Sequence, residues 1–152
     1  MQISYLCAKH NDWVYGHPQE ALHFLARDEW QGTTLFCDGQ FRECIAYLGC
    51  AFDIAVILLE VEEGQNQSMI EKVKSLSLLL CTAYESLRLT EYRRAIERRV
   101  QAVLQAVMVR VSQLLCSATA LSSGFERRLH NERLQCGVRL LGAVNLPGKS
   151  LF

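Results

Sequence analysis

Hydrophobic residues recur at helical spacing along most of the chain. The longest pattern begins after Thr90, where apolar side chains stand three or four positions apart for about seven turns. Its members are Ile96, Val100, Val103, Val107, Val111, Leu114, Ala118 and Leu121. A second pattern, in residues 68–88, follows Ser68-Met-Ile-Glu71, which has the form of a capping box. Both patterns predict helices.

The most apolar stretch is CIAYLGCAFDIAVILL, residues 44–59, in which Asp53 is the one charged side chain. We expect a helix over about 39–63, with Asp38 as its N-cap and Gly64 as the glycine after its end. A helix that is apolar on nearly all sides is either enclosed by other helices or shared with a partner. Both interpretations are open at this point.

The remaining segments are read from their turn residues. Residues 1–17 predict an irregular segment or a short strand, and Pro18 suits the first turn of a helix that ends at 31–34. Residues 122–124, Ser-Ser-Gly, predict a stop before a last helix over about 125–143, and residues 144–152 predict an irregular tail. The fold class we expect is all-α: one domain, 1–152, an antiparallel bundle of four to five helices around a central helix at about 39–63.

Length and composition argue against a membrane span in the apolar stretch. A transmembrane helix needs about 20 mostly apolar residues, and Asp53 would cost about 2.5–3.5 kcal/mol at its centre. Half of the residues are hydrophobic and 21% are charged, as in globular proteins. Residues 1–12 do not have the pattern of a secretory leader, so we expect none, and none of the seven cysteines forms a CxxC pair. We therefore expect a cytoplasmic protein with reduced cysteines and no membrane span.

Charge is distributed unevenly, although the net charge is zero. Residues 1–87 carry 12 acidic and 5 basic side chains, whereas residues 88–152 carry 4 acidic and 11 basic ones. Three explanations of this distribution are open. The two halves could pair within one molecule, they could pair between molecules, or one half could bind a charged partner. If Asp53 is buried it needs a partner, which the arginines of the second half could supply; otherwise it points to solvent.

Motifs of catalysis are absent from the sequence. It holds no GxSxG, P-loop, GxGxxG or HExxH pattern. The five residues near its start that could bind a metal match no compact zinc spacing: Cys7, His10, Asp12, His17 and His23. We expect no enzyme activity, no metal and no cofactor.

The function we expect is binding of another protein, as an adaptor, assembly factor, secretion-type chaperone or regulator. The partner could be a second copy in a homodimer. The predicted binding residues lie on the apolar helix and in the following arginine cluster: Phe52, Val56, Leu59, Arg93, Arg94, Arg98 and Arg99. The alternative is a nucleic-acid-binding regulator that uses the basic half, because arginine suits phosphate.

Overall fold

The computed structural model describes the backbone of residues 3–141 and the side chains of residues 3–118. Its elements are five helices: α1 (Ala8–Gly16), α2 (Pro18–Cys37), α3 (Phe41–Val61), α4 (Gln67–Ser86) and α5 (Thr90–Leu141). The described backbone contains no strand, so the predicted all-α bundle is confirmed. The predicted tail at 144–152 lies outside the described residues.

The chain divides into two compact units, residues 1–111 and residues 112–152. The first unit contains α1 to α4 and the first turns of α5. The second unit contains the remaining turns of α5. All side chains of the core described below belong to the first unit.

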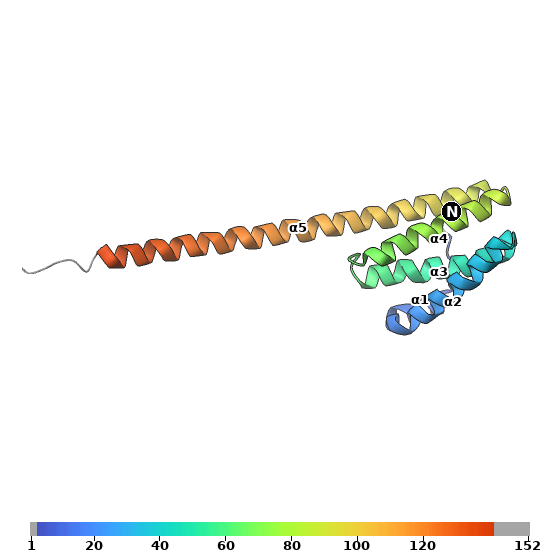
Figure 1. Ribbon diagram of the computed structural model, residues 1–152, viewed down its shortest axis with the longest axis horizontal. Coiled ribbons are helices and arrows are strands. Elements are labelled where there is room, and N and C mark those ends of the chain that lie inside the picture. Colours follow the sequence, from blue (N-terminus) through green and yellow to red (C-terminus); the bar gives the residue numbers. More distant parts are fainter. Residues whose placement is uncertain (1–2, 142–152) are drawn as a thin grey trace, which may run out of the picture. The chain divides into compact units, whose positions relative to one another are not determined.

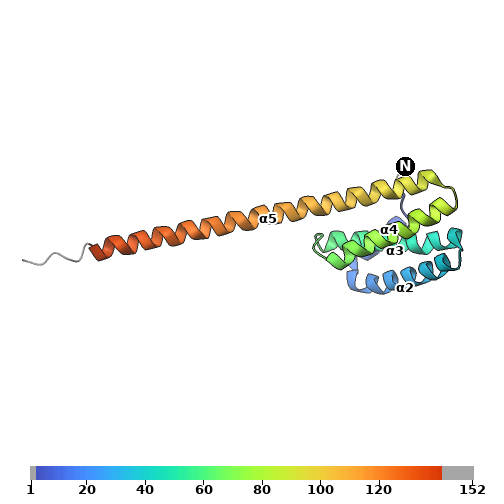
Figure 2. The same ribbon diagram turned by 45° about the horizontal axis from the view of Figure 1, so that its top comes forward.

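Helix α3 is the centre of the bundle. It lies between α2 and α4 in both ribbon views (Figures 1 and 2). Every residue from Ala51 to Leu59 is buried, including Asp53. The expectation of an enclosed, nearly all-apolar central helix is therefore confirmed, and the helix is shorter than predicted by about two residues at each end.

Close packing of α2 on α3 explains why α2 is longer than predicted. A Cβ atom at Gly32 would lie 2.7 Å from Leu48 Cγ and 2.9 Å from the Leu48 backbone nitrogen. Only glycine allows the two helices to approach so closely here. The turn-like residues 31–34 therefore do not end α2, which continues to Cys37; the packing outweighs the low helix propensity of glycine.

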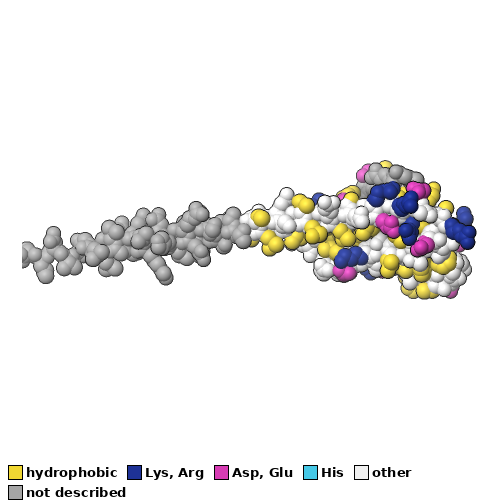
Figure 3. Space-filling model, turned by 90° about the horizontal axis from the view of Figure 1, so that it is seen from above, with side chains coloured by type: hydrophobic (Ala, Val, Ile, Leu, Met, Phe, Trp, Pro, Cys, Tyr) yellow, Lys and Arg dark blue, Asp and Glu magenta, His cyan; other side chains and the backbone are white. Residues whose placement is uncertain are grey.

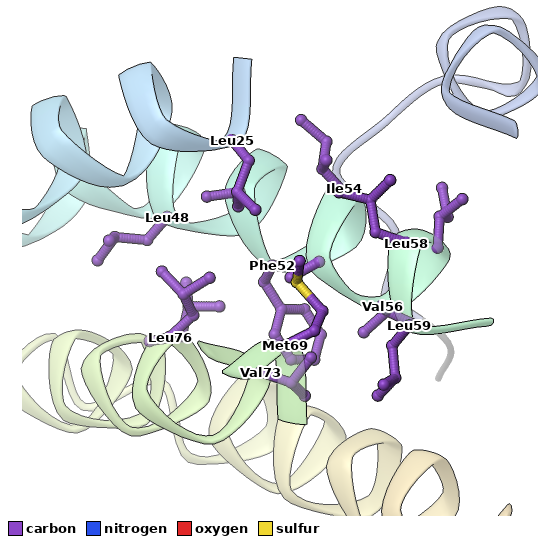
Figure 4. Close-up of a cluster of buried hydrophobic side chains, with 14 of the residues drawn as sticks. Leu25, Leu48, Phe52, Ile54, Val56, Leu58, Leu59, Met69, Val73 and Leu76 are labelled. Atoms are coloured by element: carbon purple, nitrogen blue, oxygen red, sulfur yellow. The ribbon is translucent and has the colours of Figure 1, made fainter. Parts of the chain in front are cut away.

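Helix α4 covers the opposite side of α3. In Figure 4 the ring of Phe52 points toward Met69 and Val73 of α4, and Leu48 lies opposite Leu76. These side chains are at most 6% exposed. Full burial of such a side chain contributes about 1.5–3 kcal/mol, so the α3–α4 contact is a main source of the stability of the bundle.

Three helices end in the same hydrogen-bonded turn. The residue two positions after each helix has left-handed backbone: Gly39 (φ 74°), Glu63 (φ 55°) and Arg88 (φ 58°). The next amide donates to a carbonyl five residues back: Gln40 to Leu35, Gly64 to Leu59 and Leu89 to Tyr84. This is the Schellman pattern, which satisfies carbonyls left open at a helix end.

Two predicted caps are corrected by these turns. Asp38 ends α2 and does not cap α3, which follows Gln40 without a side-chain cap. Glu63 takes the first left-handed position that was predicted for Gly64, and Gly64 follows it with φ 75°. A local sequence pattern places such a turn only to within a residue or two.

The start of α4 also differs from its predicted capping box. The side chain of Asn66, not of Ser68, accepts a hydrogen bond from the Met69 amide at 3.1 Å. Asparagine is as good an N-cap as serine, so the two candidates could not be ranked from type alone.

Residues 8–16 form α1 rather than the predicted irregular segment. Several of its residues have modest helix propensity, and its hydrophobic pattern is weak. Val14 is nevertheless buried against the core, and Trp13 packs beside it. Tertiary packing therefore stabilises a short helix that the local sequence does not indicate.

Helix α5 is a single element of 52 residues and has no stop at 122–124. The predicted last helix is part of it. Glycine in a helix costs about 1 kcal/mol relative to alanine, which does not suffice to break a long helix with favourable residues on both sides.

Candidate functional site

The buried carboxylate of Asp53 is the most highly connected polar group in the bundle. Its side chain is 1% exposed. One oxygen accepts the backbone amides of Tyr5 at 2.6 Å and Leu6 at 2.9 Å, and the Ser4 hydroxyl at 3.3 Å. The other oxygen accepts Arg99 from α5 at 2.5 Å. Asp53 thus fixes an irregular segment, residues 3–7, which we name the strap.

Arg99 joins the strap and α5 to the same carboxylate. It also donates to the carbonyl oxygen of Ile3 at 3.0 Å, and its guanidinium lies 5.0 Å from the centre of the Phe52 ring. The expectation that an arginine of the second half would pair with a buried Asp53 is therefore confirmed. Arg99, one of the predicted binding residues, is engaged within its own chain.

Tyr5 seals the strap against α3 and α4. Its ring lies over Gly49, where a Cβ atom would come within 2.2 Å of the ring. Its hydroxyl is 2.7 Å from the hydroxyl of Tyr84. Burial, followed by this hydrogen bond, raises the pKa of Tyr5 well above its usual value, so the phenol remains neutral. Asp53 and the surface around Gly49 therefore bind the strap through its backbone amides and the ring of Tyr5.

The three predicted binding residues on α3 are part of the core. Phe52 is 0%, Val56 4% and Leu59 1% exposed. A partner could reach them only if the bundle opened, so a binding role for them stays a prediction without an accessible surface in this conformation.

The arginine cluster at the start of α5 is largely paired with nearby carboxylates. Arg93 contacts Glu85 and Glu97 at 3.4 and 3.5 Å, and Arg94 contacts Glu91 at 3.0 Å. Figure 3 shows acidic and basic side chains intermixed on one face of the bundle. Arg98 is exposed and makes no ion pair among the described residues. These pairs reduce the positive surface that a phosphate backbone would meet.

Several large apolar side chains of α5 are exposed: Met108, Val109, Val111, Leu114 and Leu115. Its stripe is buried at the start, where Ile96 is 0% exposed, and still at Val107, which is 9% exposed. In the first unit Val111 of the same stripe is 40% exposed, and in the second unit Leu114 is 45% exposed. The sequence had identified this stripe as one side of a helix.

Val107 marks where the cover ends. A Cβ atom on Gly64, in the turn between α3 and α4, would lie 3.2 Å from Val107 Cγ2. Stripe residues before this turn belong to the core or pack against it, as Val100 and Val103 do. We name the uncovered continuation, centred on Val111 and Leu114, the α5 face.

A pocket of about 560 Å³ opens between α1, α2 and α3. Most of its wall is apolar, with Trp13, Phe24 and Ile54 among the lining residues. Asp28 is 6% exposed and pairs with the neighbouring Arg27 at 2.8 Å. The carboxylate therefore already has a cationic partner within the chain. The volume is within the range of small-molecule sites.

Three of the described cysteines, Cys44, Cys50 and Cys81, have protonated thiols that are poor nucleophiles. Burial raises the pKa of Cys44 to about 11 and also raises the pKa of Cys50 and Cys81. Such thiols hold little thiolate at neutral pH, and the thiolate is the reactive form. No disulfide joins the six cysteines within the described side chains.

The candidate metal ligands near the start of the chain have local partners. Cys7 Sγ lies 3.2 Å from His10 Nδ1, and the ring of His17 stacks on Trp13 with Nδ1 3.0 Å from the Trp13 carbonyl oxygen. Within residues 3–118, no three His, Cys, Asp or Glu side chains gather closely enough to hold a metal ion.

Within the described part of the chain, two helical segments are long and apolar enough to cross a membrane, judged by length and composition. They are Phe41–Val61, with mean hydropathy 2.1, and Thr90–Ala118, with mean hydropathy 1.3. The first is mostly buried within the bundle, as a core helix of a folded domain is. The second includes the α5 face, which sequence reasoning had not considered as a span.

Comparison with known protein families, curated proteins and solved structures gives no match to this chain. The function must therefore be argued from the surface and the contacts described above.

Proposed function

We propose that the protein is a binding module that captures an α-helix of a protein partner on the α5 face. One observation carries the proposal: a stripe that packs into the core from Ile96 to Val107 continues along the same helix at Val111 and Leu114 without cover. Exposed continuous apolar surface is characteristic of interaction sites. A helix laid along such a face would bury it in the way that α3 and α4 bury the earlier turns.

The chemistry of the molecule agrees with a binding role. The buried carboxylate Asp53 is used to hold the strap and α5, and the buried thiols remain protonated. Such a module recognises its partner by shape and apolar area, which suits an adaptor, assembly factor or regulator. A cytoplasmic location belongs to the same proposal.

Affinity purification from the source organism tests this function with one matched pair of variants. Val111 and Val109 are the same residue type, are 40% and 50% exposed, and lie on opposite sides of α5, because two residues turn a helix by about 200°. We expect the tagged wild-type chain and Val109→Glu to retain the same protein partner. Val111→Glu should lose it, since a charge would be buried in the interface.

Circular dichroism of both variants provides the folding control. Each replaces an exposed valine by a better helix former, so helix content should remain at the wild-type level. Equal recovery of all partners by Val109→Glu and Val111→Glu would refute the proposed binding surface.

A further inference from the structure

We propose that the pocket between α1, α2 and α3 binds a medium-chain fatty acid, that is, a carboxylate on a flexible apolar chain. The site is separate from the α5 face, so the inference goes beyond the proposed function. The pocket has a volume of about 560 Å³, and its lining residues come from the strap and from all three helices. All of these residues belong to the first unit of the chain.

The floor of the pocket is apolar. Val14 and Ile54 line it and are only 2% and 3% exposed. In Figure 4 Ile54 lies on the side of α3 opposite to Phe52 and α4. Leu6 of the strap adds a third aliphatic side chain to the lining. Water in such a space finds few hydrogen-bond partners, so a hydrocarbon chain that displaces it is favoured.

One wall of the pocket is formed by aromatic rings that are already fixed by contacts within the chain. The rings of Trp13 and Phe24 meet edge to face at 5.3 Å, and Trp13 also stacks on His17 at 5.0 Å. The Arg27 guanidinium lies 4.9 Å from the centre of the Phe24 ring. Because these side chains are ordered before a ligand arrives, binding has less entropy to lose.

The mouth of the pocket is basic. Lys9, His10 and Arg27 are lining residues and are exposed to solvent. Asp28 is the one carboxylate among the described lining residues, and Arg27 already pairs with it through Nε at 2.9 Å and Nη2 at 2.8 Å. Lys9 has no ion-pair partner among the described residues. A ligand carboxylate at the mouth would supply one.

The distribution of polar groups in the lining selects the class of ligand. A cationic ligand would have to compete with Arg27 for the carboxylate of Asp28, whereas an anion meets the unpaired ammonium of Lys9. The thiol of Cys50, a weak hydrogen-bonding group, is the other polar side chain away from the mouth. Hydroxyls or ring nitrogens along the body of a ligand would therefore lack partners. A ligand with one charged end and a plain hydrocarbon chain leaves no such group unpaired.

Tryptophan fluorescence of the full-length chain tests the site. The sequence has two tryptophans, and Trp30→Phe leaves Trp13, in the pocket wall, as the reporter. Trp30 is 68% exposed, so its replacement should not disturb the fold. We expect decanoate, below its micelle concentration at neutral pH, to change the Trp13 emission saturably. It should bind at least about tenfold more tightly than decanol, which has the same chain without the charge.

Two pairs of variants in this background locate the ligand. Lys9→Gln should reduce the affinity for decanoate to that for decanol, whereas Lys74→Gln, at an exposed lysine of α4, should leave it unchanged. Phe24→Ala should weaken both ligands about tenfold, because it removes part of the wall. Leu22→Ala is its matched control, since both side chains lie on α2 and are 40% exposed but only Phe24 lines the pocket. Circular dichroism checks that every variant is folded.

Four outcomes would overturn the fatty-acid site. They are no saturable change of emission up to about 1 mM decanoate, equal affinities for decanoate and decanol, tighter binding of decylammonium than of decanoate, and decanoate affinity that is unchanged in both Lys9→Gln and Phe24→Ala. The third would assign the pocket to a cation at Asp28, and the fourth would place the ligand elsewhere on the chain. None of them bears on the α5 face, whose test is the loss of a partner in Val111→Glu.

Discussion

At the scale of single residues, the molecule depends on one buried carboxylate. Asp53 accepts four hydrogen bonds, from three strap residues and from Arg99. Desolvating a charge is costly unless it is paired and hydrogen-bonded, and here each oxygen has a donor. An acid in the most apolar helix is therefore an organising contact between α3, α5 and the strap.

Replacement of Asp53 by asparagine should lower the free energy of unfolding by about 3 kcal/mol, because it leaves the Arg99 guanidinium without its counter-charge. The value is at the low end for buried pairs, since the Arg99 side chain is 25% exposed. Urea denaturation measures it. Arg94→Ala, which breaks an exposed pair with Glu91, is the control and should cost less than about 1 kcal/mol. Equal losses would show that burial of Asp53 is not decisive.

A methyl group at Gly49 should displace the strap, because it would occupy the position of the Tyr5 ring. We expect Gly49→Ala to cost about 1–3 kcal/mol and to speed hydrogen exchange at the amides of Tyr5 and Leu6. Gly16→Ala is the matched control, since a Cβ atom there meets nothing within 4 Å. An unchanged rate of hydrogen exchange in Gly49→Ala would contradict the described contact between the Tyr5 ring and Gly49.

At the scale of elements, the turns that end the helices matter as well as the side chains that pack between them. Glu63 and Arg88 take left-handed backbone that glycine adopts more easily, and both do so in turns that complete the hydrogen bonds of a helix end. The two turns therefore carry a strain that the remaining contacts of the bundle offset.

Arg88→Gly should raise the free energy of unfolding by up to about 1 kcal/mol, because it removes the steric penalty of left-handed backbone. Leu87→Gly, one residue earlier and in right-handed backbone (φ −87°), should instead destabilise by a similar amount. Thermal unfolding of the two variants would show shifts of opposite sign. A loss of stability in Arg88→Gly would indicate that the arginine side chain outweighs the strain.

Hydrophobic pattern was sufficient to predict α3, α4 and the start of α5, because their periodic residues form the core. It did not predict α1, whose stability comes from contacts such as that of Val14, or the close approach at Gly32, which has the local appearance of a turn. The site was anticipated in part: the excess of acid before residue 88 and of arginine after it suggested the pairing of Asp53. The strap could not be foreseen, since Tyr5 and Leu6 bind through backbone amides that every sequence has.

At the scale of the whole molecule, ion pairs between the acidic and the basic half of the sequence partly neutralise its uneven charge. Arg93 contacts Glu85, and Arg99 contacts Asp53; each pair joins a basic residue after position 87 to an acidic one before it. The net charge of the sequence is zero. Surface fields that would attract a polyanion are correspondingly reduced.

The wild-type chain should therefore pass through a heparin column at 50 mM salt with little retention. Phosphate or sulfate contacts from an arginine cluster would instead give retention that weakens steeply as salt increases. Retention that persists to 200 mM salt and is abolished by Arg94→Ala with Arg98→Ala would favour the nucleic-acid alternative over the binding module.

The connection between the strap and Arg99 also has a consequence for biosynthesis. Ile3 and Arg99 are separated by 96 residues, so at roughly 5–20 residues per second the ribosome makes the strap about 5–20 s before the arginine that holds it. During this interval the strap and the most apolar helix have been made, but Asp53 lacks its counter-charge and the carbonyl oxygen of Ile3 lacks its donor. Native closure must therefore occur late in translation, and nascent chains that stop before Arg99 are the ones expected to depend on chaperones.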